Sequence, residues 1–317
     1  MKKAGKIIVI VVVVIAVLGI VGNLLGGGEE TEGTKAIVEN TEAAGEDVTT
    51  DAAEEEPETQ EPTQAASTGL PTIEEQVLVD QNGIKITAVE LVDDGIWGTG
   101  LKLLIENNTD QDVGISCDAL IVNNYMIANL FSATVASGMK SNETVDLYST
   151  ELEASGIENI GQIELKMHSF DGETYETIEE YDLAVIQTSE YESMDVQALD
   201  DGTELVNQDG VRIVGKYVDE DSFWGAGVLL YLENNSGRNV TVSCEDMSVN
   251  GYMITPVFAE TVYDGKMSIS DITIFESDLE ENGITAIEDI ELKFHVYDSD
   301  DYSTVFDTDA IAFSVTP

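Results

Sequence analysis

The chain has 317 residues and a formal net charge of −50, from 63 acidic and 13 basic residues. Such a charge argues against nucleic acid and an anionic membrane surface as partners, because both would repel the chain. It has two cysteines and two histidines, and their spacing fits no zinc site, so we expect no cofactor of that kind.

Residues 1–25 have the length and polarity of a transmembrane helix. The uncharged run at residues 7–25 would extend about 28 Å at about 1.5 Å per residue, close to the thickness of the hydrocarbon core. Lys2, Lys3 and Lys6 precede it, so the positive-inside rule places the N-terminus in the cytoplasm. A cleaved signal peptide is the alternative, although no Ala-x-Ala site follows. We therefore expect a single-pass cell-membrane protein with extracellular C-terminal domains.

Residues 26–72 have the composition of a disordered acidic linker. They contain no aromatic residue and three of the five prolines, with many Glu, Asp, Thr and Ala residues. Such a segment buries too little apolar surface to offset the entropy of the chain. It would hold the folded part away from the membrane, and an acidic docking tail is the alternative.

The remainder consists of two copies of one unit, at residues 73–188 and 204–317, joined by an inter-domain linker at residues 189–203. WGTGLKLLIENNTDQDVGISC begins at Trp97, and WGAGVLLYLENNSGRNVTVSC begins at Trp224, an offset of 224 − 97 = 127 residues. Each copy is long enough to bury its own core.

Alternating apolar residues predict the strands of each copy. Leu101, Leu103 and Ile105 share one face with Trp97, so the tryptophan is expected to face the core. The strand ends at Glu-Asn-Asn-Thr, a turn sequence. A slip in phase after Cys117 predicts a bulge, and the Asn pair at 123–124 predicts a hairpin.

The later elements follow the same logic. Residues 149–156 predict one helical turn, and the second copy has a capping-box sequence at residues 277–280. Ile163, Leu165 and Met167 alternate with Glu164, which is placed on the outer face. A last strand is predicted over residues 175–186.

Seven or eight short strands per copy, with little helix, indicate an all-β protein. We predict two tandem immunoglobulin-like β-sandwich domains after the transmembrane helix and the linker, with a small closed barrel as the alternative. Cys117 and Cys244 occupy equivalent positions, so a disulfide between them is not expected, and each is predicted to be a buried core residue.

The arrangement resembles a group of uncharacterised membrane-anchored proteins of Gram-positive bacteria with tandem immunoglobulin-like domains. The matching motifs are at residues 83–86, 97–100 and 106–109, and again at residues 210–213, 224–227 and 233–236. The resemblance implies a fold and a surface location, and it implies no activity. The zinc ribbon that relatives often carry has no counterpart in this chain.

Few residues suggest catalysis. His168 and His295 are the only histidines, one in each copy, and are expected on the surface. No Gly-x-Ser-x-Gly motif is present, and one histidine per copy gives a Ser-His-Asp triad little support. A pair of carboxylates for glycoside hydrolysis stays open, because carboxylates are abundant. We predict that the protein is not an enzyme.

Calcium is the one metal that the sequence suggests. Asp298, Asp300 and Asp301 occupy one turn, close to Asp307 and Asp309, and calcium prefers such clustered oxygen ligands. A second acidic cluster lies at residues 219–221. Neither is an EF-hand loop, and solvated surface charge is the alternative.

These observations favour a membrane-anchored extracellular binding or adhesion module, with an unknown protein or cell-wall partner. The alternative is a structural spacer or an ectodomain that senses the envelope. The first predicts an exposed apolar or aromatic patch, and the second predicts smooth charged surfaces and contacts between the copies. An enzyme would need a rigid pocket lined by perturbed carboxylates.

Overall fold

A computed structural model of the chain describes residues 69–93, 97–222 and 224–314. These residues all belong to one compact unit. The predicted transmembrane segment at residues 1–25, and nearly all of the predicted linker at residues 26–72, lie outside them. Within the described ranges, no helix has both the length and the apolar character needed to cross a membrane.

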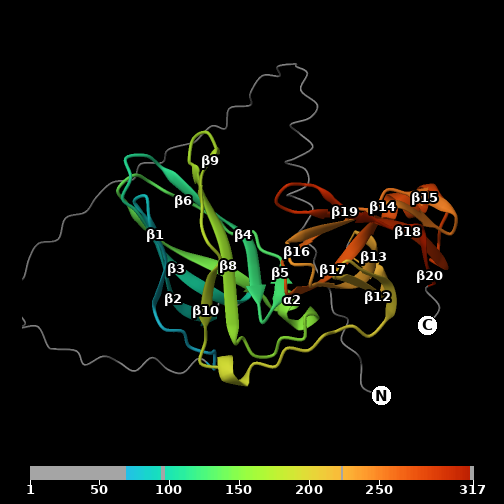
Figure 1. The fold of residues 1–317 in the computed structure, drawn as a ribbon, viewed down its shortest axis with the longest axis horizontal. Coiled ribbons are helices and arrows are strands. Elements are labelled where there is room, and N and C mark those ends of the chain that lie inside the picture. Colours follow the sequence, from blue (N-terminus) through green and yellow to red (C-terminus); the bar gives the residue numbers. More distant parts are fainter. Residues whose placement is uncertain (1–68, 94–96, 223, 315–317) are drawn as a thin grey trace, which may run out of the picture. The chain divides into compact units, whose positions relative to one another are not determined.

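The first repeat contributes two sheets that face each other (Figure 1). One has the strand order β1-β2-β3-β7, and the other includes β10-β8-β4-β5 with β6 beside β4 and β9 beside β8. Their bounds are β1 (Gln76–Gln81), β2 (Ile84–Asp93), β3 (Gly98–Asn107), β4 (Val113–Val122), β5 (Tyr125–Ile127), β6 (Ser132–Val135), β7 (Lys140–Tyr148), β8 (Gln162–Asp171), β9 (Thr177–Glu180) and β10 (Ala184–Gln187).

The second repeat has the same strands in the same order. β11-β12-β13-β17 corresponds to the first sheet, and β15-β14-β18-β19 with β16 and β20 corresponds to the second. Their bounds are β11 (Thr203–Gln208), β12 (Val211–Ser222), β13 (Gly225–Asn234), β14 (Val240–Val249), β15 (Tyr252–Ile254), β16 (Ala259–Val262), β17 (Lys266–Phe275), β18 (Asp289–Asp298), β19 (Thr304–Asp307) and β20 (Ile311–Ser314). The all-β prediction is confirmed.

Helix is confined to short pieces in the described part of the chain. They are α2 (Ser149–Ala154), α3 (Glu276–Glu281) and a 3-10 helix, η1 (Tyr191–Ser193), in the inter-domain linker. The predicted capping box of the second copy is wrong. A capping box at residues 277–280 would make Ser277 the N-cap, but helix α3 already begins at Glu276, and Phe275, which precedes it, makes no side-chain cap.

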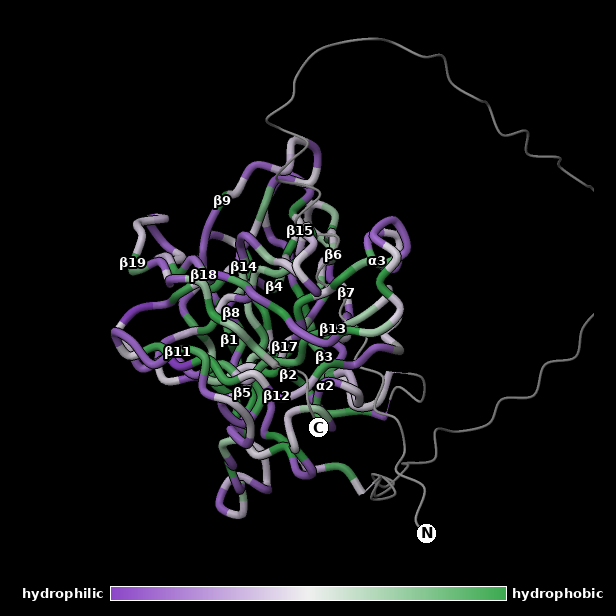
Figure 2. The backbone as a smooth tube through the Cα atoms, turned by 90° about the vertical axis from the view of Figure 1, so that its right-hand side faces the viewer, coloured by the Kyte–Doolittle hydropathy of each residue, from purple (hydrophilic) through white to green (hydrophobic). Residues whose placement is uncertain are grey.

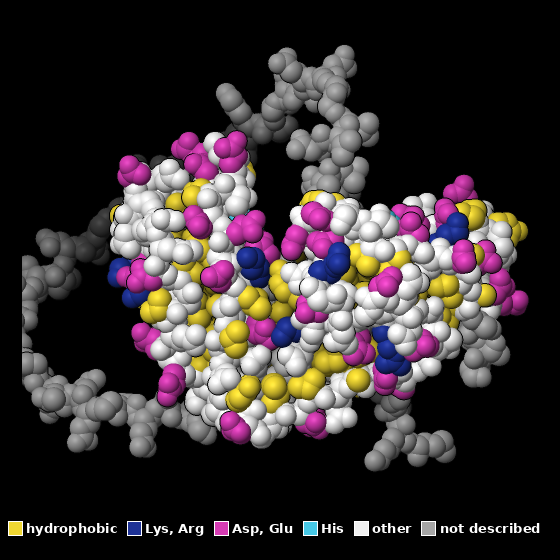
Figure 3. Space-filling view, viewed as in Figure 1, with side chains coloured by type: hydrophobic (Ala, Val, Ile, Leu, Met, Phe, Trp, Pro, Cys, Tyr) yellow, Lys and Arg dark blue, Asp and Glu magenta, His cyan; other side chains and the backbone are white. Residues whose placement is uncertain are grey.

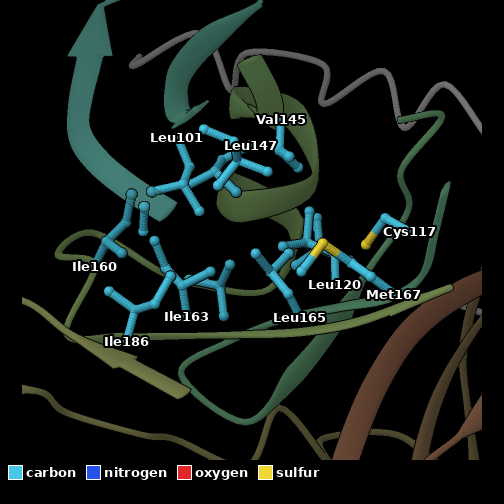
Figure 4. Close-up of a cluster of buried hydrophobic side chains, with 14 of the residues drawn as sticks. Leu101, Cys117, Leu120, Val145, Leu147, Ile160, Ile163, Leu165, Met167 and Ile186 are labelled. Atoms are coloured by element: carbon cyan, nitrogen blue, oxygen red, sulfur yellow. The ribbon is translucent and has the colours of Figure 1, made fainter. Parts of the chain in front are cut away.

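The alternating apolar residues form the core of each repeat. Figure 4 shows Leu101, Val145 and Leu147 of one sheet packed toward Leu120 and Leu165 of the other. Burial of such a side chain contributes about 1.5–3 kcal/mol. Cys117 and Cys244 are buried and unpaired, as predicted. In Figure 2 the hydrophobic segments follow the strands, while the turns at the rim are largely hydrophilic.

The prediction that the tryptophans face the core is wrong. Trp97 and Trp224 are 51% and 44% exposed. Gly98, which follows Trp97, has a φ of 107°, and this left-handed conformation interrupts the alternation that holds from Leu101 onward. The Trp97 ring lies edge-on to Tyr148, with ring centroids 5.8 Å apart.

The local predictions around the second sheet are mostly confirmed. A register shift between Cys117 and Ala119 provides the predicted bulge, and the copy has one in the corresponding region. The hairpin at residues 123–124 joins β4 to β5. The single strand predicted over residues 175–186 is instead two strands, β9 and β10. Tyr181, between them, is buried in the core, so the chain leaves β8 before pairing with it again.

The two repeats share one sheet, which the sequence does not predict. β5 of the first repeat pairs in parallel with β17 of the second, with Met267 opposite Tyr125 and Ser268 opposite Met126. A ten-stranded sheet therefore contains strands of both copies. The linker is also docked, because Leu199 packs against the first core and its carbonyl accepts a hydrogen bond from Lys216 Nζ at 2.6 Å.

Candidate binding site

Each repeat carries a row of three rings, which we call the aromatic row. In the first repeat it consists of His168, Phe170 and Tyr175, with successive ring centroids 5.9 and 6.0 Å apart. In the second repeat the equivalent residues are His295, Tyr297 and Tyr302, at 5.2 and 6.2 Å. The same three positions therefore carry a row of rings twice in one chain, with Tyr175 and Tyr302 each stacked on its neighbour and His168 tilted by 49° against Phe170.

The strands explain the first two rings of each row. Residues two apart in a strand lie on the same face, about 7 Å apart. Met167 of β8 points into the core, so His168 and Phe170 alternate with it and point outward. β18 has the same phase, with Phe294 in the core and the second row on the outer face.

A tight turn places the third ring. Asp171 Oδ1 accepts hydrogen bonds from the backbone N–H groups of Glu173 and Thr174, both at 2.9 Å. In the second repeat Asp298 Oδ1 accepts from Asp300 at 2.9 Å and Asp301 at 3.4 Å. An aspartate that bonds the backbone two residues on is a turn former. Both turns return the chain so that a tyrosine lies against the ring on the strand.

Both tyrosines adopt a backbone conformation that their side chains disfavour. Tyr175 and Tyr302 have φ values of 62° and 61°. Among the described residues eight non-glycine residues have positive φ, and the other six are Asn or Asp, which tolerate it. A left-handed bulky residue costs about 1–3 kcal/mol. Both tyrosines are also 76% exposed, so burial does little to offset this strain.

The histidine of each row is held by a carboxylate. His168 Nδ1 lies 2.6 Å from Asp118 Oδ1, and His295 Nδ1 lies 2.5 Å from Asp307 Oδ1. Asp118 comes from β4, whereas Asp307 comes from β19. The sequence prediction of surface histidines missed both pairs, because the two carboxylates do not occupy equivalent positions. Burial raises the pKa of Asp118, although the nearby His168 opposes this rise.

The structure gives the three calcium candidates separate surroundings. Asp298 Oδ1 closes the turn, and its Oδ2 lies 3.6 Å from Arg238 Nη1. Asp301 Oδ1 accepts the Ser303 N–H at 2.8 Å, and hydrogen bonding by the Ser303 side chain, followed by its backbone N–H, lowers the pKa of Asp301. Asp300 lines a cleft. No three His, Cys, Asp or Glu side chains in the described ranges are arranged to hold a metal ion. The calcium hypothesis therefore rests on the sequence.

That cleft lies where the second aromatic row faces the first repeat. It has a volume of about 700 Å³ and is lined from the second repeat by Asp300 and Tyr302, and from the first by Lys166 and Glu180. Glu180 pairs with His168 in the strand register, so the cleft runs between the two rows. In Figure 3 acidic side chains are spread widely over the visible face, whereas basic ones are few.

A second cavity, of about 160 Å³, lies at the junction and holds buried carboxyl groups. Burial raises the pKa of Glu151 on α2 to about 7, and the charges of Glu260 and Asp271 add to the rise. The pKa of Glu260 is also raised to about 7 by burial, although Ser268 Oγ donates to its Oε1 at 2.6 Å. Neighbouring Asp271, whose pKa burial raises to about 6, has one oxygen without a hydrogen-bond partner.

The comparisons with known proteins leave the family open. No family model matches the chain. No curated protein matches it either. A solved structure of the Salmonella enterica SafA pilin with the SafB chaperone covers 74% of this chain and 98% of its own, at 12% identity and a TM-score of 0.23. A Porphyromonas gingivalis protein of unknown function covers 68% and 89%, at 7% identity and a TM-score of 0.18. Likenesses this low carry no argument.

Proposed function

We propose that this chain is a membrane-anchored extracellular binding or adhesion module without enzymatic activity, and that the aromatic rows are its ligand contacts. Its two sandwiches would be tandem immunoglobulin-like domains, in line with the sequence resemblance. The apolar run at residues 7–25 would anchor them, and the partner would be a protein or a cell-wall component outside the cell.

The observation that carries this proposal is the pair of strained, exposed tyrosines. Stacking between two aromatic rings contributes about 0.5–1.5 kcal/mol, and the strain of a left-handed bulky residue, about 1–3 kcal/mol, is of similar or larger size and opposes it. Tyr175 and Tyr302 therefore add little to folding. Tyrosine is enriched in the energetic centres of binding surfaces, where an apolar ring and a hydroxyl serve together. A binding role explains why the same unfavourable arrangement occurs in both repeats.

The test compares retention of the full chain, in detergent, on Gram-positive cell walls and on immobilised envelope proteins. Tyr175→Gly with Tyr302→Gly removes both rings and relaxes both turns. Asn82→Gly with Asp209→Gly is the matched control, since these residues also have positive φ, at 50° and 49°, in equivalent turns. We expect retention to fall at least tenfold for the tyrosine variant and to stay unchanged for the control. Equal retention of all three proteins, or no retention of the wild type, would refute the proposal.

The spacer or sensing ectodomain remains the second candidate, because the junction between the repeats favours it. The β5–β17 pairing and the ion pair of Lys266 with Glu164, at 2.6 Å, hold the copies together, as that hypothesis predicts. The exposed aromatic rows count against its expectation of smooth charged surfaces. A change in the docking of the repeats between pH 5 and pH 8, measured by solution scattering, would support a sensing role.

The pocket at Glu151 and Glu260 is the feature that an enzyme would need. Its volume of about 160 Å³ is smaller than the roughly 300–1,000 Å³ of typical ligand pockets. We therefore propose that these carboxyl groups make the stability of the junction depend on pH, and we propose no reaction for them.

A further inference from the structure

The strand that joins the two repeats has an equivalent that is held in the same way. The hairpin before β5 is fixed by Asn123, whose Nδ2 donates to Asn159 O at 2.7 Å and whose Oδ1 accepts the Gly161 N–H at 2.9 Å. The hairpin before β15 is fixed by Asn250, whose Nδ2 donates to Ala286 O at 2.8 Å and whose Oδ1 accepts from the backbone at 2.9 Å. Each repeat therefore presents the same Tyr-Met-Ile strand at the same edge.

The two strands differ in what covers them. Tyr125 of β5 is 1% exposed, and its hydroxyl donates to Gln197 O at 2.5 Å. The equivalent Tyr252 of β15 is 50% exposed, and Met253 beside it is 68% exposed. In the described part of the chain β15 pairs with β14 alone. It is a copy of the docking strand without a partner.

The first repeat contains a copy of the accepting strand. β17, which accepts β5, corresponds to β7 of the first repeat, because 267 − 127 = 140 places Lys140 at the position of Met267. β7 is the last strand of its sheet. Met139 beside Lys140 is 60% exposed. Within the described residues, β15 is therefore an unfilled docking edge and β7 an unfilled accepting edge, and the two strands belong to different sheets.

We propose that β15 of one molecule pairs with β7 of another in parallel, repeating the β5–β17 junction from head to tail. In the internal junction Met267 lies opposite Tyr125 and Ser268 lies opposite Met126. The same register between molecules would place Lys140 opposite Tyr252. The contact joins two different surfaces, so it leaves a free edge at each end and extends without closing.

The charges of the two surfaces match this arrangement. Lys85, Lys102 and Lys140 lie on neighbouring strands of the first repeat, with side chains 37%, 44% and 63% exposed. They share two carboxylates of the same sheet, Glu90 and Glu106, so this group of side chains keeps one net positive charge (3 − 2 = 1). Asp289 and Glu291 are exposed on β18, which lies two strands from β15 in the same sheet. Opposite charges across an interface favour one pairing and disfavour like-with-like contacts.

The contact between molecules is weaker than the internal junction. In the second repeat Leu229, Tyr231 and Ile269 pack into the first core, whereas Lys102, Leu104 and Asn142 occupy these positions in the first repeat. The net charge of −50 also opposes association. Head-to-tail pairing should therefore need a high local concentration, such as neighbouring chains on one membrane would have.

Cysteine cross-linking of the full chain tests the register. Lys140→Cys with Tyr252→Cys would place two thiols opposite each other in every contact, within disulfide range for paired strands. The native cysteines do not interfere, since burial raises the pKa of both thiols to about 12. Asn82→Cys with Tyr302→Cys is the control pair, on turns outside both edges.

We expect oxidation of the first pair, at high protein concentration in detergent, to give a ladder beyond dimers that is at least tenfold more abundant than for the control pair. A mixture of the two single variants should stop at mixed dimers. Equal cross-linking of test and control pairs would overturn the proposal. Efficient dimers of Lys140→Cys alone would overturn it too, because they would show symmetric pairing of β7. Neither outcome depends on whether the aromatic rows bind a ligand.

Discussion

Replacement of Glu151 by glutamine tests how the junction responds to pH. Glu151 is buried on α2, at the cavity between the repeats. Its pKa of about 7 in the folded protein, against 4.5 for an ordinary glutamate side chain in water, arises first from burial and then from the charges of Glu260 and Asp271. Because the folded state disfavours the charged form, this carboxyl imposes no penalty below about pH 4.5. The penalty grows as the pH rises and is complete above about pH 7.

The size of the effect follows from the two pKa values. A difference between 4.5 and about 7 corresponds to about 3 kcal/mol of unfolding free energy. Glutamine has nearly the same shape and no charge. Glu151→Gln should therefore raise the free energy of unfolding by about 3 kcal/mol at pH 8 and leave it nearly unchanged at pH 4.

Urea unfolding between pH 4 and pH 8, followed by far-UV circular dichroism, measures this difference. Glu153→Gln on the same helix is the control, since Glu153 is exposed and its replacement should leave the pH profile unchanged. A Glu151→Gln variant that is less stable than the wild type at pH 8, or whose profile runs parallel to that of the wild type, would refute the reasoning.

Three further predictions concern buried polar groups. Asn107→Ala removes an amide that donates to two main-chain carbonyls at 2.8 and 2.9 Å, and should lower the urea-unfolding free energy by about 3 kcal/mol; a loss below 1 kcal/mol would contradict this. Lys266→Met leaves the buried Glu164 carboxylate unpaired and should destabilise by about 3–5 kcal/mol, and adding Glu164→Gln should restore most of the loss in the same assay. Cys117 and Cys244 should resist thiol reagents at pH 8 until urea unfolds the chain, and fast labelling of the native protein would contradict their burial.

Local patterns in the sequence predicted the strands and turns because each depends on a few neighbouring residues. The Asn107 turn is an example, since Asn107 Oδ1 accepts hydrogen bonds from Thr109 and Asn107 Nδ2 donates to Gln111 O, all within one short motif. The Trp97 prediction failed for a local reason as well. Period-two alternation ends where Gly98 adopts a left-handed conformation, and the sequence contains only a glycine to indicate it.

The junction and the candidate site depend on contacts between distant residues. Glu164 has the phase of an outward residue, and only the docking of the second repeat covers it. The carboxylates on the two histidines come from different strands, so no spacing identifies them. The sequence does contain one pattern that could have indicated the aromatic rows. Asp171 and Tyr175 recur as Asp298 and Tyr302, so each turn repeats a tyrosine where a small polar residue would suffice.

The free energy of unfolding of the double variant Tyr175→Gly, Tyr302→Gly tests the central claim most directly. At each site, relief of about 1–3 kcal/mol of strain offsets the loss of about 0.5–1.5 kcal/mol of stacking and the entropy of the added glycine, about 0.5–1 kcal/mol. If the rings are held for binding, the variant should remain within about 1 kcal/mol of the wild type. A loss of several kcal/mol would show that the tyrosines support the fold, and would remove the reason for assigning the aromatic rows to a ligand.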